Sequence, residues 1–374
     1  MNHIRNPKKD ELVTAGLRQL FEMRGFVQAR VNKFEEYELY IDNKRFLDSE
    51  RIITFMDMDG KLLALKPDVT LSIVKNVSAK PLNRFEKLYY IDEVCRVSRE
   101  SREYKMLSQV GVELIGPQDP FVSLEILDLA LESLALISDD FVLDLSHQGF
   151  VSGLLDTVDT DYSTRERLVE ALHSKSPHTV ATILDDAGIN GDVKQRFCAL
   201  AALSGNITAA LPEAEALIAS PPMREAWEEL DKLGAMLRAC GMDERVNLDF
   251  SVVNDLDYYN GLIFIGYVKG VPDVVLTGGR YDNLMTKMGK HNGAIGFAVF
   301  LSQLNTYFKS GKTYDFDVLL QYDADCDYAE LLAQVRRFTA DGKSVRLEQV
   351  GGKPACICLE AWRFGPDGLR KEAL

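Results

Sequence analysis

Two neighbouring segments of alternating apolar and polar residues constrain the fold more than any other part of the chain. Residues 88–97 and 107–115 each alternate as a half-buried strand does, and the stretch between them is polar and charged. Strands so close in the sequence pair most simply with each other. The pattern therefore predicts a long antiparallel hairpin with a solvated loop at residues 98–106.

One face of this hairpin carries polar groups that suit a small zwitterion. A period of two places Arg96 on one face of the first strand, and Gln109, Gly111 and Glu113 together on one face of the second. A guanidinium binds a carboxylate, a carboxylate binds an ammonium group, and an amide binds a neutral polar group. An ordinary solvent-facing sheet fits the same spacing, which does not choose between the two interpretations.

Composition favours a protein of more than one domain that does not enter a membrane. The 374 residues are 46% hydrophobic, which suggests two or three domains with a sizeable core. No apolar run approaches the roughly 18 residues of a membrane span, and the N-terminus lacks the apolar core of a signal peptide. The six cysteines show no zinc-like pairing, so we expect no metal site and reduced thiols in a cytoplasmic protein. A net charge of −14 counts against binding of a polyanion.

Outside the hairpin, helical and strand patterns alternate in the first part of the chain. We expect helices at 10–24, 69–77 and 120–137, and strands at 26–31, 52–56, 62–65 and 141–145. Gly25 is placed to end the first helix, and Asp68 is placed to cap the second. Residues 160–240 are rich in alanine and helical periodicity, with few strand signals, which predicts an all-helical insertion.

Strand alternation resumes at residues 246–253, and residues 294–304 fit a strand running into a helix. After residue 311 a small α/β unit is expected. Its predicted strands are 316–321, 344–347 and 355–359, its helix is 328–339, and residues 364–374 are expected to form a loose tail.

Four ordered segments resemble the motifs of class II aminoacyl-tRNA synthetases, and most closely those of histidyl-tRNA synthetases. They are the strand, charged loop and QVGVELIG strand around Arg96, LKPDVT at 65–70, LDYYNG at 256–261 with GGRYD at 278–282, and AIGFAVFLSQL at 294–304. The segment after residue 26, which lacks the motif 1 proline, is the weakest match. The resemblance implies an α+β fold, in which helices flank a mixed, largely antiparallel sheet. It places the core at 1–311, a helical insertion at about 160–242, and a shortened anticodon-binding-like domain at 312–374.

The same resemblance implies a histidine-binding site made of Asp68, Thr70, Arg96, Gln109, Glu113, Tyr258 and Tyr259. Arg96 is expected to bind the histidine carboxylate, while Asp68, Gln109 and Glu113 hold the amino group. Tyr258 and Tyr259, with Glu113, are the candidates for the imidazole end, and how Glu113 divides between the two ends stays open. From the residues alone, the tyrosine pair also fits an aromatic core and Asp68 fits a helix cap.

The nucleotide side of the resembling site departs from the family pattern. Motif 3 of histidyl-tRNA synthetases ends Gly-Leu-Glu-Arg-Leu, whereas residues 300–304 read FLSQL, so Gln303 replaces the arginine that holds ATP. Asn254 stands where the histidine motif has its arginine, and Ser98 stands where motif 2 has an acid. The loss of one preorganised charge typically costs about 10²–10³ in rate. The loss of two predicts that amino-acid activation is absent and that the chain has no catalytic residue.

A site that keeps its binding groups and loses its chemistry is similar to that of the regulatory subunits of ATP phosphoribosyltransferase, a synthetase-like family. This resemblance implies a non-catalytic chain that forms a hetero-octamer with a short catalytic subunit. The regulatory chain is required for activity and carries histidine feedback inhibition of the first step of histidine biosynthesis. A homodimer through the core, no cofactor and no tRNA partner are also implied. Two alternatives stay open: an unusual histidyl-tRNA synthetase with compensating cations, and a histidine-binding synthetase-like module of another complex.

Overall fold

The computed structural model describes residues 9–41, 52–81, 83–98, 101–253, 259–308, 314–351 and 357–372. The chain divides into two compact units, Val13–Leu304 and a smaller one that contains Asn305–Leu374. Among the described residues, no helix is both long enough and apolar enough to cross a membrane.

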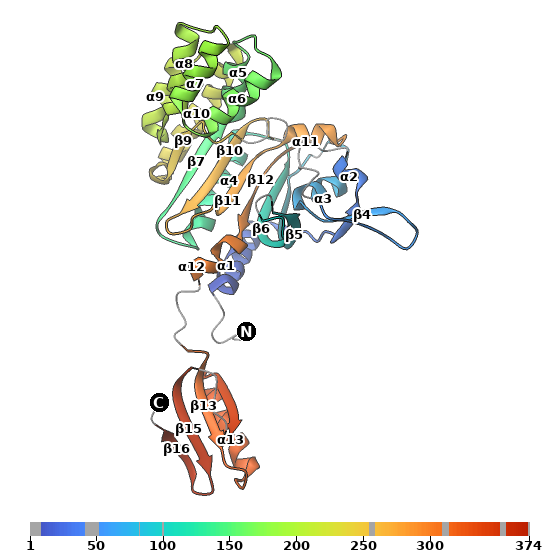
Figure 1. Ribbon diagram of the computed structural model, residues 1–374, viewed down its shortest axis with the longest axis vertical. Coiled ribbons are helices and arrows are strands. Elements are labelled where there is room, and N and C mark those ends of the chain that lie inside the picture. Colours follow the sequence, from blue (N-terminus) through green and yellow to red (C-terminus); the bar gives the residue numbers. More distant parts are fainter. Residues whose placement is uncertain are drawn as a thin grey trace. The chain divides into compact units, whose positions relative to one another are not determined.

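Within the described part of the larger unit, nine strands form one sheet in the order β1-β5-β6-β12-β11-β10-β7-β9-β8 (Figure 1). The strands are β1 (Val27–Gln28), β5 (Glu86–Val97), β6 (Tyr104–Gly116), β7 (Phe141–His147), β8 (Ser204–Asn206), β9 (Val246–Asp249), β10 (Leu262–Val268), β11 (Leu276–Arg280) and β12 (Gly293–Phe300). Of the eight neighbouring pairs, six are antiparallel, and β1–β5 and β7–β9 are parallel. The mixed, largely antiparallel sheet predicted from the sequence is confirmed.

The predicted hairpin is β5 and β6, and it is longer than the alternation indicates. Strand β6 begins at Tyr104, so the connection spans 98–103 and not 98–106. Tyr104 and Met106 pair with β5 through the backbone although both side chains are exposed. Backbone hydrogen bonds can hold two strands together where no side chain is buried. A prediction based on apolar periodicity therefore makes the strand too short.

Helices cover both faces of this sheet. On one face, α1 (Lys9–Met23) and α4 (Pro120–Ala135) lie close together, and Phe21 of α1 contacts the rings of Tyr89 and Phe297. The opposite face packs against α2 (Glu38–Ile41), α3 (Val69–Asn76) and α11 (Asp282–Lys287). The predicted helices are confirmed, and Gly25, at φ +82°, follows the end of α1 in the left-handed region that glycine tolerates.

A small second sheet of the same unit has the order β2-β4-β3. Its strands are β2 (Phe34–Glu36), β3 (Thr54–Met56) and β4 (Leu62–Leu65), all antiparallel to their neighbours. Gly60 has φ +81° in the turn between β3 and β4. The predicted pair of strands around this turn is confirmed.

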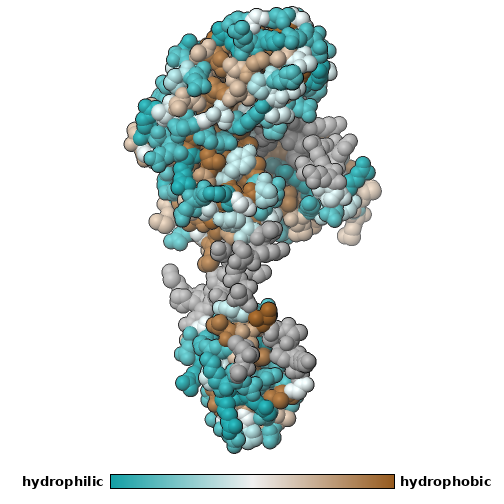
Figure 2. All heavy atoms as spheres, turned by 60° about the vertical axis from the view of Figure 1, so that its left-hand side comes forward, coloured by the Kyte–Doolittle hydropathy of each residue, from teal (hydrophilic) through white to brown (hydrophobic). Residues whose placement is uncertain are grey.

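A helical lobe follows β7 and consists of α5 (Gln148–Leu155), α6 (Tyr162–His173), α7 (Pro177–Asp186), α8 (Asp192–Ala202), α9 (Ile207–Ala216) and α10 (Pro221–Ala239) (Figure 1, green to yellow). Its outer surface is mainly hydrophilic in the view of Figure 2. The prediction that residues 160–240 are all helical is wrong in one place. Strand β8 pairs with β9 at the sheet edge, and the Ser204 hydroxyl donates to Asp249. A Ser-Gly-Asn strand carries no alternation, because it is held by a partner distant in sequence.

The lobe returns to the sheet through a 3-10 turn at Asp243–Arg245, and β12 continues into a 3-10 helix, Leu301–Leu304, and α12 (Asn305–Phe308). The described part of the smaller unit beyond α12 has a four-stranded sheet in the order β14-β13-β15-β16 and one long helix. Its elements are β13 (Phe316–Tyr322), α13 (Tyr328–Ala340), β14 (Val345–Gln349), β15 (Cys358–Gly365) and β16 (Gly368–Glu372).

The end of the chain corrects the expected loose tail. Strands β15 and β16 form an antiparallel hairpin, with Gly365 paired to Gly368. Phe364 is buried in the core of the smaller unit, and Leu369 packs against that core. Three consecutive charged residues, Arg370 to Glu372, follow Leu369, so β16 shows no apolar alternation in the sequence.

Candidate functional site

The structure brings the predicted site residues that it describes to one face of the central sheet. Arg96 lies on β5, and Gln109 and Glu113 lie on β6, with Gln109 between the other two along the hairpin. Asp68 and Thr70 approach this face from the start of α3. Tyr259 precedes β10, whereas Tyr258 lies outside the described residues.

Glu113 is the most enclosed of these groups. The residue is only 2% exposed, and its carboxyl accepts two hydrogen bonds, from the Thr70 hydroxyl at 2.6 Å and from the Tyr281 hydroxyl at 2.5 Å. Burial raises the pKa of Glu113 to about 8, although both hydrogen bonds act to lower it. This buried carboxyl therefore changes its charge close to neutral pH.

Three glycines make room for the Glu113 carboxyl and for the rings of Tyr90 and Tyr259. A Cβ at Gly296, the cross-strand neighbour of Glu113, would lie 2.1 Å from the carboxyl oxygen. A Cβ at Gly111 would lie 2.5 Å from the Tyr90 hydroxyl, and one at Gly279 would lie 2.6 Å from the Tyr259 ring. Gly279 sits inside β11 and marks neither a bulge nor a turn. These positions need glycine because side chains pack directly against the sheet backbone.

Asp68 caps a helix and also faces the site. One carboxyl oxygen accepts a hydrogen bond from the Leu71 amide at 2.8 Å, and the other lies 3.6 Å from an Arg96 nitrogen. The Arg96 Nε donates to the Pro67 carbonyl at 2.7 Å. The two interpretations of Asp68, as a cap and as a site residue, are therefore compatible, since each uses a different oxygen.

Two tyrosines that the sequence analysis did not select belong to the site. Tyr281 donates to Glu113, and burial with the nearby Glu113 and Asp68 carboxyls raises the pKa of Tyr90 and of Tyr259. Tyr281 lies in the GGRYD segment, which the resemblance includes as a motif without assigning a role to this tyrosine. Tyr90 shares the period-two face of Arg96, so the alternation of β5 carried a usable signal.

Two of the substituted positions of the nucleotide side, Ser98 and Gln303, line one cavity, whereas Asn254 lies outside the described residues. The cavity has a volume of about 440 Å³ and is lined by Arg96, Val97, Ser98, Lys105, Met106, Leu107, Ser302 and Gln303. Ser302 is fixed in the wall, because its hydroxyl accepts a hydrogen bond from the Ser108 amide at 2.8 Å. The wall formed by Ser302 and Gln303 is polar and uncharged, so it supplies no positive charge to a triphosphate.

Within the ranges that the structure describes, no group of three or more histidine, cysteine, aspartate or glutamate residues is placed to hold a metal ion. The candidate site residues that the structure describes on this face are hydrogen-bonding and charged groups. Such groups can bind and orient an amino acid.

Comparison with known proteins identifies the family. The sequence model described as histidyl-tRNA synthetase matches residues 5–304. The ATP phosphoribosyltransferase regulatory subunit of Thermoanaerobacter sp. (strain X514) is 32% identical over 286 residues, which are 75% of this chain and 74% of that protein.

Two solved structures share the fold. A regulatory subunit/histidyl-tRNA synthetase from Bacillus halodurans has a TM-score of 0.76 at 24% identity, covering 93% of this chain and 90% of that one. A chain of the ATP phosphoribosyl transferase (HisG:HisZ) complex from Thermotoga maritima has a TM-score of 0.61 at 19% identity, covering 78% and 97%. The chain thus belongs to the histidyl-tRNA synthetase family, and within it to the regulatory subunits of ATP phosphoribosyltransferase.

Proposed function

We propose that this chain is the non-catalytic regulatory subunit of an ATP phosphoribosyltransferase, that it binds L-histidine, and that it carries histidine inhibition to a short catalytic subunit. One observation carries the proposal. Arg96 lies on the same sheet face as the enclosed Glu113, and it also lines a cavity in which Ser302 and Gln303 are uncharged. The Glu113 face can hold an amino acid, while the cavity has no positive charge at Gln303, the position where the family pattern places the arginine that holds ATP.

In the proposed complex, Arg96 binds the histidine carboxylate, and Asp68 and Gln109 hold its amino group. Tyr259 and the neighbouring Tyr258 enclose the imidazole, and Thr70 fixes the Glu113 carboxyl. Glu113 itself contacts either the amino group or the imidazole.

A proton measurement separates the two roles of Glu113. With a pKa of about 8, this carboxyl is mostly protonated at pH 7 in the free protein. An ammonium partner requires it to ionise, so binding would release a proton, whereas a neutral imidazole nitrogen can accept its proton as a hydrogen bond. Titration calorimetry at pH 7 in two buffers of different ionisation enthalpy distinguishes them. A buffer-dependent heat assigns Glu113 to the amino group, and a buffer-independent heat assigns it to the imidazole.

The proposed assembly is a hetero-octamer in the cytoplasm, with a homodimer through the core and with neither tRNA nor a cofactor. The relatives' name and the Thermotoga maritima complex support the catalytic partner. The small β2-β4-β3 sheet supports the homodimer, because it exposes Phe34, Phe55, Met56 and Leu62, with the two phenylalanine rings 5.5 Å apart. The division into a core at 1–311 and a C-terminal unit at 312–374 belongs to the same proposal.

Reconstitution with a short catalytic chain tests the function. We expect the mixture to form one large complex on size exclusion, to gain phosphoribosyltransferase activity, and to be inhibited by histidine. Inhibition requires histidine to favour one state of the complex, with a coupling of about 1–3 kcal/mol in the usual range. A Tyr258→Ala/Tyr259→Ala double variant should still assemble and should resist histidine. Full inhibition of that variant would move the feedback site to another surface.

A further inference from the structure

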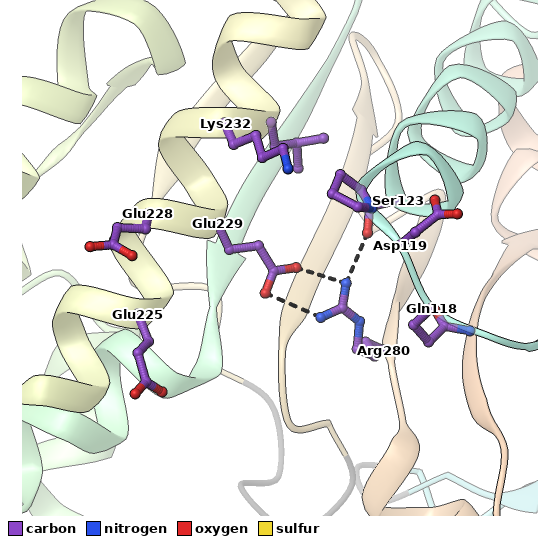
Figure 3. A pocket seen from close by; sticks show the side chains of 10 residues that line it. Gln118, Asp119, Ser123, Glu225, Glu228, Glu229, Lys232 and Arg280 are labelled. Atoms are coloured by element: carbon purple, nitrogen blue, oxygen red, sulfur yellow. Dashed lines mark hydrogen bonds and ion pairs between the residues drawn. The ribbon is translucent and has the colours of Figure 1, made fainter.

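Glu229 forms an ion pair with Arg280 where the helical lobe meets the sheet (Figure 3). Glu229 lies on α10, Arg280 ends β11, and the two oxygens of one contact the two terminal nitrogens of the other at 2.7 and 3.1 Å. Arg280 also donates to the Ser123 hydroxyl of α4 at 2.9 Å, and Glu229 lies 3.2 Å from the His147 ring at the end of β7. Four elements therefore meet at one pair of charges.

The pair lies beside a cavity of about 410 Å³ whose other charged groups are on its rim. The Arg280 and Glu229 side chains are 15% and 34% exposed, whereas Glu225 and Glu228 of the same helix are less enclosed. Burial opposes ionisation of Glu229, but the His147 hydrogen bond and the Arg280 charge outweigh it and lower its pKa to about 2. The carboxylate therefore stays charged at neutral pH, and partial burial strengthens its attraction to the guanidinium.

The backbone of Arg280 belongs to the proposed histidine site. Its neighbour Gly279 lies under the Tyr259 ring, and its other neighbour, Tyr281, donates to the buried site carboxyl. The Arg280 carbonyl accepts a hydrogen bond from the Asn260 amide at 3.2 Å, which fixes the residue that follows Tyr259. A displacement of this end of β11 therefore moves groups on two sides of the pocket together.

The lobe has a separate attachment to the core. Helix α5, which continues directly from β7, packs against α10 at its glycines: a Cβ at Gly153 would lie 2.9 Å from the Met223 side chain, and one at Gly149 would lie 3.7 Å from Ala226. This apolar contact contains neither Glu229 nor Arg280. The ion pair is thus better suited to hold the end of β11 than to hold the lobe.

We propose that Glu229 is a positioning residue for the histidine site, acting through Arg280 to fix the end of β11 and, with it, Tyr259 and Tyr281. The identity of the ligand, histidine, rests on the proposed function. The effect of Glu229 on the position of the end of β11 does not depend on it. Contacts of this kind, away from the ligand, typically change an affinity by about 2- to 30-fold.

Glu229→Gln removes the charge with little change of shape, and Glu228→Gln is the matched control one residue away. Within the described residues, Glu228 makes no ion pair and lines the same cavity. In the ligand-free full chain, hydrogen exchange of peptides covering 259–262 and 279–282 should be several-fold faster in Glu229→Gln and unchanged in Glu228→Gln. Calorimetry should show histidine affinity reduced about 2- to 30-fold in the first variant alone. Glu229→Asp, which keeps the charge, should restore part of both.

Faster exchange confined to α10 peptides, with the pocket peptides unchanged, would overturn the inference. Glu229 would then stabilise only the packing of the helical lobe. If the wild-type chain binds no histidine, the proposed function fails. The exchange data still show whether Glu229 positions the end of β11. Should Glu229→Gln fail to fold, Arg280→Lys carries the same test, because lysine keeps the charge but cannot form two parallel contacts.

Discussion

Two regions meet at Arg96, the enclosed face around Glu113 and the cavity lined by Ser302 and Gln303. They differ in how closely their polar groups pack against the sheet. Around Glu113, two hydroxyl groups bind the carboxyl and Gly296 lets it lie against the backbone, so the polar groups are part of the packing. On the nucleotide side, Ser302 and Gln303 line a cavity at the end of β12. Residues at such an end can lose charge without disturbing the core. A packed face and a peripheral cavity can therefore change independently, because charge can be lost at the cavity while the fold keeps the Glu113 face in place.

The largest expected effect concerns the nucleotide side. Histidine- and ATP-dependent pyrophosphate exchange by the pure protein should be at background, because two missing preorganised charges together cost roughly 10⁴–10⁶ in rate. A radiolabel exchange assay alongside a histidyl-tRNA synthetase measures this. Exchange well above background that disappears in Arg96→Ala would restore the synthetase alternative and end the contrast between the two sides.

The next largest effect is the pH dependence of stability that the Glu113 carboxyl causes. The folded pKa of Glu113 is about 8, above an ordinary value of 4.5, so the stability it contributes is fully present below about pH 4.5 and is lost as the pH rises towards 8. A difference of one between the folded and unfolded pKa values corresponds to about 1.4 kcal/mol of unfolding free energy. Relative to Glu113→Gln, the wild type should therefore lose a few kcal/mol of unfolding free energy between pH 5 and pH 8, on the order of 1 kcal/mol for each pH unit.

Urea unfolding of both proteins at several pH values measures this difference. Glu166→Gln, on the exposed side of α6, controls for the loss of one carboxyl at the surface. Parallel stability curves for the wild type and Glu113→Gln would show that the carboxyl is not held in a raised-pKa environment.

Local patterns explain which parts of this site were predictable. The face shared by Arg96, Gln109 and Glu113 follows from a period of two in one hairpin, and the Asp68 cap follows from its place before α3. The Tyr281 bond to Glu113 joins residues 168 positions apart, and no local pattern specifies such a contact. Strand β8 was missed for a related reason, since backbone pairing with a distant partner holds it. The β15–β16 hairpin was missed because charged residues interrupt its apolar pattern.

Truncation of the same carboxyl should have an intermediate effect on binding. Glu113→Ala removes a hydrogen bond to the ligand and takes from the Tyr281 and Thr70 hydroxyls the acceptor that they share. We expect histidine affinity to fall by about 1.5–3 kcal/mol, or about 10- to 150-fold. Calorimetry of Glu113→Ala and Arg96→Ala tests the site as a whole. Unchanged affinity in both would place the ligand elsewhere.

The smallest expected effect tests the packing that separates the two sides. In Gly296→Ala the new methyl would lie 2.1 Å from the Glu113 carboxyl and 2.3 Å from the Val112 carbonyl, so the carboxyl or the strand must move. Overpacking of this kind costs about 1–3 kcal/mol, which should appear both as lower stability and as weaker histidine binding. Gly205→Ala in β8 is the control, because its Cβ would meet no atom within 4 Å. Equal melting temperatures and equal affinities for the two variants would mean that the enclosed side is as tolerant of change as the nucleotide side. The contrast drawn from the sheet packing would then be lost.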